Sequence, residues 1–298
     1  MFDFRLRVFH TVARRLSFTK AAEELFITQP AVTKHIHEIE RYYKAQLFER
    51  AGNKIILTRA GKLLLEHTEG LMDIHRNIEF ELNELHQAYK GKLLIGASTT
   101  IAQYVLPPVL AHFHNKFKEV KIALLTGNTG EIETALMQKD ISLGIIEGKS
   151  KNRSFRYTPL TKDEIVLVAS ANHPKAKRAS LKIEELLKVP LLLREPGSGT
   201  LEVVSHALRK AGIKMQQLQV EMQMDSSESI KGYLLNSDCM AFLSVHSVLK
   251  ELRNKELSVI DVKGLNIERY FYIIHPHGEP AGLSDLFMKF ALRYNFKL

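Results

Sequence analysis

The stretch SFTKAAEELFITQPAVTKHIHEIERYYKAQLFERAGNKIILTRAGK, residues 17–62, decides how the N-terminal part of the chain folds. Ser17 and Thr28 belong to the residue types preferred at helix N-caps. Apolar residues follow each of them at helical spacing. The sequence therefore predicts a short helix over 18–25 and a longer one over about 29–43.

The longer helix is expected to have two different faces. At 100° per residue, four side chains fall in one narrow arc and predict a buried face: Val32, Ile36, Ile39 and Tyr43. The opposite side carries Pro30, Lys34, His37 and Arg41. Two short helices followed by a helix with a basic outer face are typical of a recognition helix in the DNA major groove. An ordinary helix with a solvated face gives the same pattern, so both interpretations stay open at this point.

The flanking segments complete a small domain. Upstream, apolar residues at spacings of three and four predict a first helix with one buried stripe: Phe2, Leu6, Phe9, Ala13 and Leu16. Downstream, two short apolar runs, Leu47-Phe48 and Ile55–Leu57, flank a Gly-Asn turn, which predicts a β-hairpin with a basic tip. Such a hairpin acts as a wing and is expected to bring Arg50, Asn53 and Lys54 near DNA phosphates or the minor groove.

Residues 59–86 predict one long helix, because the stretch contains no proline and has apolar residues every seven positions: Leu64, Leu71, Ile78 and Leu85. A heptad repeat of this kind is typical of a helix that pairs with its own copy. His67 and Glu81 at the intermediate positions make the repeat imperfect. A single amphipathic helix packed on its own domain is the alternative interpretation.

Beyond Lys92 the pattern changes to short β-like runs that alternate with helical ones. The runs are LLIGA (93–97), KIALLTG (121–127), LGIIEG (143–148), IVLVAS (165–170), PLLL (190–193), MAFLS (240–244) and YFYIIH (270–275). Strands that alternate with helices predict an α/β sheet covered on both faces. This region is long enough for two domain-sized halves, and a final helix over about 282–295 is expected to pack back on the first half. The result would be a two-lobed body with a cleft.

Three loops that follow predicted strands are candidates for ligand binding. They are Ser98-Thr99-Thr100, Gly127-Asn128-Thr129 and Gly197-Ser198-Gly199-Thr200. Ligands of α/β sheets bind at the carboxyl ends of strands, where helix N-termini present free amide protons to anions. We therefore expect an anionic ligand, bound by Ser98, Thr99, Thr100, Asn128, Thr129, Ser198, Gly199 and Thr200. Each loop taken singly is equally consistent with a simple helix cap.

Composition limits the possible functions. The chain has 298 residues, 45% of them hydrophobic, and a net charge of +9, which fits a folded multi-domain protein with polyanionic partners. Its single cysteine, Cys239, excludes an internal disulfide, fits a reducing compartment and lies in a run that predicts an inert buried thiol. Neither a signal peptide nor a membrane span is predicted, so we expect a cytoplasmic protein.

No pattern of reactive residues indicates an enzyme. Ser198 lies in P-G-S-G rather than in a nucleophile elbow, and the chain has neither an H-E-x-x-H motif nor a glycine-rich phosphate loop with lysine. We expect no catalytic residues, no cofactor and no metal. A cytoplasmic solute-binding module without a transcriptional role is the alternative, but it leaves the N-terminal helices unexplained.

Residues 17–62 resemble the N-terminal signature of LysR-type transcription regulators along the whole stretch, including the AA pair, the TQPAVT helix start, the LF-x-R strand and the LT-x-AG turn. The resemblance implies a recognition helix that contacts a promoter operator in double-stranded DNA. By this resemblance, the residues that face bases are Gln29, Pro30, Thr33 and Lys34, and those that face phosphates are Thr28, Arg50 and Lys54.

The same resemblance implies dimerisation through the long helix, and commonly assembly into tetramers. It also implies an effector domain similar to a periplasmic binding protein, with the ligand between two α/β lobes. The string REPGSGT (194–200) resembles versions found among regulators of sulfur and cysteine metabolism, so a small sulfur anion is one candidate effector. An aromatic carboxylate or an amino acid stays open.

The predicted fold class is therefore α/β, with a winged helix-turn-helix DNA-binding domain over 1–58 and a linker and dimerisation helix over 59–91. An effector-binding domain follows over 92–298, with lobe I over about 92–160 and 267–298 and lobe II over about 161–266. We expect a sequence-specific transcription regulator, a homodimer or homotetramer, that responds to a small anionic effector.

Overall fold

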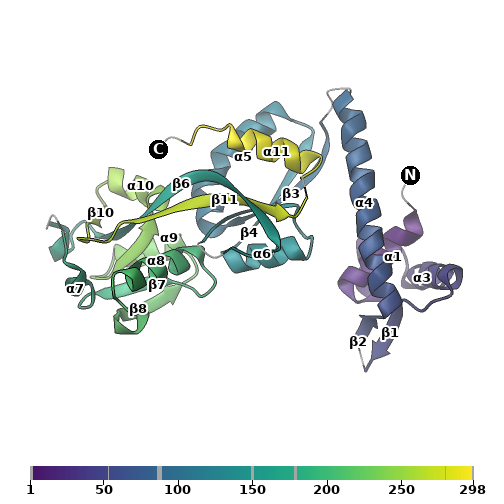
Figure 1. Cartoon of the computed structure of the whole chain (residues 1–298), viewed down its shortest axis with the longest axis horizontal. Coiled ribbons are helices and arrows are strands. Elements are labelled where there is room, and N and C mark those ends of the chain that lie inside the picture. The colour runs from purple at the N-terminus through teal and green to yellow at the C-terminus, as the bar shows by residue number, and fades with distance from the viewer. Residues whose placement is uncertain are drawn as a thin grey trace. The chain divides into compact units, whose positions relative to one another are not determined.

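The computed structural model describes residues 3–52, 54–85, 89–148, 151–177, 180–278 and 280–296. Contacts within the chain divide it into two compact units, Met1–Gln87 and Ala88–Leu298, each of which is described by itself (Figure 1). In the described ranges, no helix combines the length and the apolar character needed to cross a membrane.

The N-terminal unit is a helix-turn-helix with a β-hairpin and a long helix. Its elements are α1 (Phe4–Arg15), α2 (Phe18–Leu25), α3 (Gln29–Tyr43), β1 (Phe48–Ala51), β2 (Lys54–Leu57) and α4 (Arg59–Leu85). The side chains of Asp3, Ser17 and Thr28 each accept a hydrogen bond from an amide in the first turn of the helix that follows. Local capping therefore fixes where the first three helices begin, as the sequence predicted for α2 and α3.

The first three helices share one core, formed by Val8, Phe9, Val12, Ala13, Ala21, Ala22, Val32, Ile36, Ile39 and Leu47. Two predicted core positions are wrong. Leu16 is exposed because it is the left-handed C-cap residue of α1. Tyr43 is also exposed, because α3 reaches past the core at its last residue, where the Tyr43 ring packs edge to face on Tyr42.

The turn between the hairpin and α4 depends on Thr58 and Gly61. The Thr58 hydroxyl donates a hydrogen bond of 2.7 Å to the Gln46 carbonyl and accepts one of 3.0 Å from the Gly61 amide. A Cβ atom added to Gly61 would lie 2.1 Å from the Leu47 carbonyl oxygen. The LT-x-AG motif is thus explained by a cap and by a close backbone approach that only glycine permits.

Helix α4 carries exposed apolar side chains along much of its length: Leu63, Leu71, Ile74, Ile78 and Leu82. Leu64 differs from the prediction, because it packs against the core of its own domain. The side chain of Leu85 lies outside the described part. Ile74 and Leu82 were not recognised in the sequence, yet they extend the apolar stripe begun by Leu71 and Ile78.

The C-terminal unit is built on a nine-stranded mixed sheet in the order β4-β3-β5-β11-β6-β9-β7-β8, with β10 paired to β6. The strands are β3 (Gly91–Ser98), β4 (Val120–Gly127), β5 (Leu143–Glu147), β6 (Phe155–Ser170), β7 (Pro190–Arg194), β8 (Gln219–Met224), β9 (Met240–Ser244), β10 (Leu257–Ile260) and β11 (Ile267–Pro276). The helices are α5 (Leu106–Lys116), α6 (Thr129–Met137), α7 (Ile183–Leu186), α8 (Gly199–Lys210), α9 (Ser227–Leu234), α10 (Val245–Arg253) and α11 (Leu283–Leu292).

The sheet has two halves joined by the long antiparallel strands β6 and β11 (Figure 1). Parallel β3, β4 and β5 form lobe I with α5, α6 and α11, around a core that includes Ile95, Phe113 and Phe287. Parallel β7, β8 and β9 form lobe II with α8, α9 and α10, around cores that include Leu191 and Leu192. The last helix returns to lobe I, where the ring centroids of Phe287 and Phe113 lie 5.1 Å apart.

Candidate functional site

The residues predicted to contact DNA gather at the start of α3. Thr28 caps the helix, and the Gln29 Nε2 donates a hydrogen bond of 3.1 Å to the Thr33 hydroxyl. Thr28, Gln29, Pro30 and Lys34 are exposed, and Thr33 is half-buried. This end of the helix therefore offers hydroxyl, amide and ammonium groups together on one surface of the unit.

The predicted wing is present as the β1–β2 hairpin. Arg50 lies on β1 with its side chain exposed. Asn53 lies outside the described residues. Lys54 begins β2, and its side chain also lies outside the described part. Arg50 is therefore the wing residue that the structure places at the surface.

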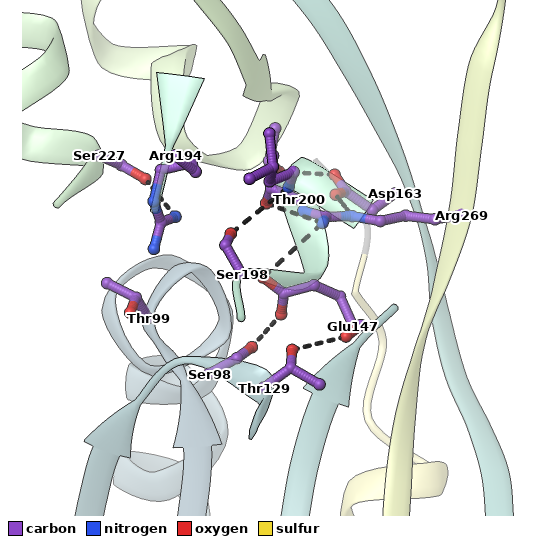
Figure 2. A network of polar contacts seen from close by, with 12 residues as sticks. Ser98, Thr99, Thr129, Glu147, Asp163, Arg194, Ser198, Thr200, Ser227 and Arg269 are labelled. Atoms are coloured by element: carbon purple, nitrogen blue, oxygen red, sulfur yellow. Dashed lines mark hydrogen bonds and ion pairs between the residues drawn. The ribbon is translucent and has the colours of Figure 1, made fainter. Parts of the chain in front are cut away.

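In the C-terminal unit, the first and third predicted loops meet between the lobes (Figure 2). Ser98 ends β3, and Ser198 caps α8 by accepting a hydrogen bond of 3.5 Å from the Leu201 amide. A Cβ atom on Gly199 would lie 2.2 Å from the Glu147 carbonyl oxygen of lobe I. The loop of lobe II thus rests directly on the strand end of lobe I. Ser98, Thr100, Ser198 and Thr200 are all buried there.

The second predicted loop joins the same contact. Asn128 caps α6 through a reciprocal pair of hydrogen bonds with Glu131. The Asn128 side chain accepts from the Glu131 amide, and the Glu131 carboxylate accepts from the Asn128 amide. The Thr129 hydroxyl donates a hydrogen bond of 2.7 Å to the Glu147 carbonyl, and the Gly130 amide donates one of 3.4 Å to the Gly197 carbonyl of lobe II. The role of Asn128 in the described structure is therefore that of a helix cap.

Glu147 lies at the centre of these loops and was not recognised in the sequence. Glu147 is 2% exposed, and its carboxylate accepts a hydrogen bond from the Ser98 hydroxyl. The other carboxylate oxygen lies 3.7 Å from the Arg269 Nη1. Buried carboxylates are tolerated when they are paired and hydrogen-bonded, as this one is.

Arg269 links both lobes to the crossing strands. Its Nε donates a hydrogen bond of 2.7 Å to Asp163 of β6, and its Nη1 donates one of 2.9 Å to the Thr200 hydroxyl. The second Asp163 oxygen accepts a hydrogen bond of 2.6 Å from the Ser244 hydroxyl. The Thr200 hydroxyl, predicted as a ligand group, thus contacts a guanidinium of the protein itself.

A second buried guanidinium stands at the end of β7. Arg194 donates two hydrogen bonds, of 2.8 and 3.1 Å, to Glu195, one of 3.0 Å to the Asp225 carbonyl and a longer one of 3.4 Å to the Ser227 hydroxyl. In Figure 2 its guanidinium is directed toward Thr99 of lobe I. Its position three residues before Gly197 of the GSGT loop was a signal in the sequence that was not recognised, because a cation beside a helix N-terminus favours an anion there.

A further contact closes the lobes beside Arg194. Tyr104 lies in the π-helical segment Ile101–Val105 of lobe I, and its hydroxyl donates a hydrogen bond to Glu228 of α9. Burial, together with this bond and the Glu228 charge, raises the pKa of Tyr104, which keeps the phenol protonated as a donor. The buried ammonium of Lys231 lies 2.9 Å from Glu228 and 2.8 Å from Glu251.

Comparison with known protein families matches two models to the chain. Residues 4–62 match the model described as bacterial regulatory helix-turn-helix protein, lysR family. Residues 86–294 match the model of the LysR substrate binding domain. The two matches together span both units of the fold.

Individual relatives cover nearly the whole chain. The chain is 29% identical over 293 residues to the HTH-type transcriptional regulator CysL of Bacillus subtilis, covering 98% of this chain and 97% of that protein. It is 31% identical over 271 residues to the HTH-type transcriptional activator CmpR of Synechocystis, covering 91% and 88%. Among solved structures, the regulatory domain of Synechocystis CcmR in complex with 2-PG superposes with a TM-score of 0.63 at 23% identity, covering 68% of this chain and 96% of that one.

Proposed function

We propose, from the premise that this chain belongs to the LysR family of bacterial regulatory proteins, that its effector is a small anion bound where the loops of the two lobes meet. The chain is a DNA-binding transcription regulator controlled by a small molecule, not an enzyme. The proposal concerns what the small molecule is and which residues hold it. We also propose that the protein is cytoplasmic, because its single cysteine, Cys239, is a buried free thiol, as expected in a reducing compartment.

The observation that carries the proposal is the buried Arg194 guanidinium beside two loops rich in hydroxyl groups. Ser98 and Thr99 lie at the end of β3, and Ser198 lies at the N-terminus of α8 (Figure 2). A helix N-terminus and a guanidinium both favour a negative charge. The anion would therefore gain from the Ser198 hydroxyl and the first amides of α8, and from Arg194, whose charge it would share with Glu195.

The contact between Ser98 and Glu147 limits the ligand in two ways. The Ser98 hydroxyl has a single proton and donates it to the Glu147 carboxylate, so a ligand that accepts from Ser98 must replace this bond. Glu147 also limits the ligand, because a second negative charge next to a buried carboxylate is repelled. We therefore favour an anion that lies toward Arg194 and Ser198, on the side of the loops away from Arg269.

Operator binding and self-association complete the proposed function. We propose that α3 contacts base edges through Gln29, Pro30, Thr33 and Lys34, and that Thr28, Arg50 and Lys54 contact phosphates, as in the usual division between base and phosphate contacts. We also propose that the exposed apolar stripe of α4 pairs two copies of the chain, because such a stripe gains by burial against a second helix.

The test begins with a thermal-shift screen of small anions, including sulfate, thiosulfate, phosphate and carboxylates, followed by calorimetric titration of the best one. We propose that Thr100, the buried last hydroxyl of the Ser98–Thr100 loop, also donates to the anion. Thr100→Val and Ser198→Ala should each lower its affinity by roughly tenfold or more, since a hydrogen bond to a charged group is worth about 1.5–3 kcal/mol. Thr134→Val is the matched control, because that hydroxyl bonds to the Gly130 carbonyl of its own helix. Native affinity in both test variants would show that these loops are only helix caps.

A further inference from the structure

Glu147 lies between a partner in its own lobe and a partner on a crossing strand. Its carboxylate accepts a hydrogen bond from the Ser98 hydroxyl of lobe I, while its other oxygen lies 3.7 Å from the Arg269 Nη1 of β11 (Figure 2). In a hydrogen bond, the nitrogen of an N–H donor lies about 2.7–3.2 Å from the acceptor. The contact between Glu147 and Arg269 is therefore an ion pair without a hydrogen bond.

The Arg269 guanidinium can take one more acceptor. Its Nε donates to Asp163 and its Nη1 donates to Thr200, whereas Nη2 is buried and has no hydrogen-bond partner among the described residues. Because Nη2 is shielded from solvent, an acceptor for it must come from the side chains packed around it. The Glu147 carboxylate is already beside this guanidinium, and such pairs are strongest when two N–H donors meet two oxygens.

Ser98 can serve one acceptor at a time. A serine hydroxyl has a single proton, and here it is donated to Glu147. An anion that accepts from Ser98 must therefore displace the carboxylate from this hydroxyl. A buried carboxylate that loses a donor without gaining another costs free energy. Arg269 offers the replacement, and a shift toward it also moves the Glu147 charge away from the anion, which lowers their repulsion.

We infer that Glu147 is a relay residue, whose carboxylate exchanges the Ser98 hydroxyl for the Arg269 guanidinium when an anion takes the Ser98 donor. The new bond would join β5 of lobe I to β11, and Arg269 in turn holds Thr200 of lobe II. Binding at the effector loops would thus be converted into a tighter joint between the lobes. The relay rests on the proposed function in one respect, which is that the effector accepts a hydrogen bond from Ser98.

Ser98→Ala in the full-length chain removes the hydroxyl that the effector would take, so it should cause the exchange with no ligand present. In a crystal structure of this variant, a Glu147 carboxylate oxygen should lie about 2.7–2.9 Å from Nη1 or Nη2 of Arg269, the usual length of such a charged hydrogen bond. Thr129→Val is the matched control, because that hydroxyl bonds to the Glu147 backbone carbonyl and not to its carboxylate. A carboxylate that keeps its place in Ser98→Ala, or that moves equally in Thr129→Val, would overturn the relay.

Hydrogen exchange in solution gives a second test, in which the sign of the effect is decisive. Glu147→Gln should lower the protection of the amides of residues 143–147 more in the Ser98→Ala background than in the native one, by about tenfold, because it then removes a hydrogen bond between charged groups. If the carboxylate gained no donor in Ser98→Ala, the same substitution would neutralise an unpaired buried charge and raise the protection. A rise, or an equal effect in the two backgrounds, would overturn the relay. Both measurements are made without a ligand, so their outcome is independent of the anion titrations that test the proposed function.

Discussion

The Tyr104 hydroxyl of lobe I donates a hydrogen bond of 2.5 Å to the Glu228 carboxylate of lobe II. Tyr104 follows the Ser98–Thr100 loop within one short helical segment, and Glu228 follows Ser227, which accepts from Arg194. The bond therefore connects the two walls of the proposed effector site. Opening of the lobes must break it, and closure must form it.

Tyr104→Phe is expected to favour opening of the lobes without loss of the fold. The ring stays and only the hydroxyl is removed, so the closed form should lose about 1.5 kcal/mol, the low end of the range for a hydrogen bond to a charged group, because the Glu228 side chain is 58% exposed. Hydrogen exchange should rise in residues 98–105 and 226–231. Tyr42→Phe, at an exposed ring of the other unit, is the control. Unchanged exchange in both segments would mean that the bond does not hold the lobes together.

The pH dependence of this bond follows from the state of Glu228. Burial alone would raise the pKa of Glu228, but hydrogen bonds from Tyr104 and Lys231 bring it below its ordinary value. A lowered carboxyl pKa stabilises the closed form fully above the ordinary glutamate value of about 4.3, and the effect is lost as the pH falls toward the lowered pKa. The difference between the native chain and Tyr104→Phe should thus be constant from about pH 5 to 7 and shrink below about pH 4. A difference that grows on acidification would contradict the assignment.

Lys34→Ala is expected to weaken binding to the native operator by about 1–3 kcal/mol, the worth of a good base contact, while leaving thermal stability nearly unchanged. The reason is that Lys34 is exposed on α3 opposite the buried Val32 and Ile36. Fluorescence anisotropy on labelled operator DNA measures the effect. Lys263→Ala removes the same charge at an exposed residue of the other unit and controls for net charge. If the binding isotherms of the native chain and Lys34→Ala superimpose, Lys34 does not contact a base and is only a solvated lysine.

Leu71→Asp is expected to prevent pairing of α4 with its copy, because it places a charge in the middle of the exposed apolar stripe. Sedimentation velocity at micromolar concentration should then show a smaller species than the native chain. Val259→Asp, at an exposed apolar residue of β10, should sediment as the native chain does. If Leu71→Asp also behaves as native, the interface lies elsewhere.

Gly61→Ala is expected to destabilise the N-terminal unit by about 1–3 kcal/mol, the range for overpacking, because the new methyl group would meet the Leu47 carbonyl at 2.1 Å. Gly70→Ala is a matched control on the same helix, where an added Cβ meets no atom within 4 Å. Chemical denaturation should separate the two variants. Equal stability would show that the backbone relaxes at no cost.

The sequence determined the features of this chain that depend on neighbouring residues. The caps at Ser17 and Thr28, the turn at Gly52 and the alternation of strands with helices all follow from local geometry, and the structure contains each of them. Ser98, Thr100, Ser198 and Thr200 could also be placed at strand and helix ends, because strand–loop–helix junctions leave a local pattern.

Tertiary structure alone decided which side chains face one another across the chain. Glu147, Arg194 and Arg269 come from three different strands, and no spacing in the sequence relates them. Each is buried, so its charge must meet an acceptor or a donor supplied by another segment. The same limit explains Tyr43 and Leu64, since helical periodicity fixes the direction of a side chain but not how far the core of the domain extends.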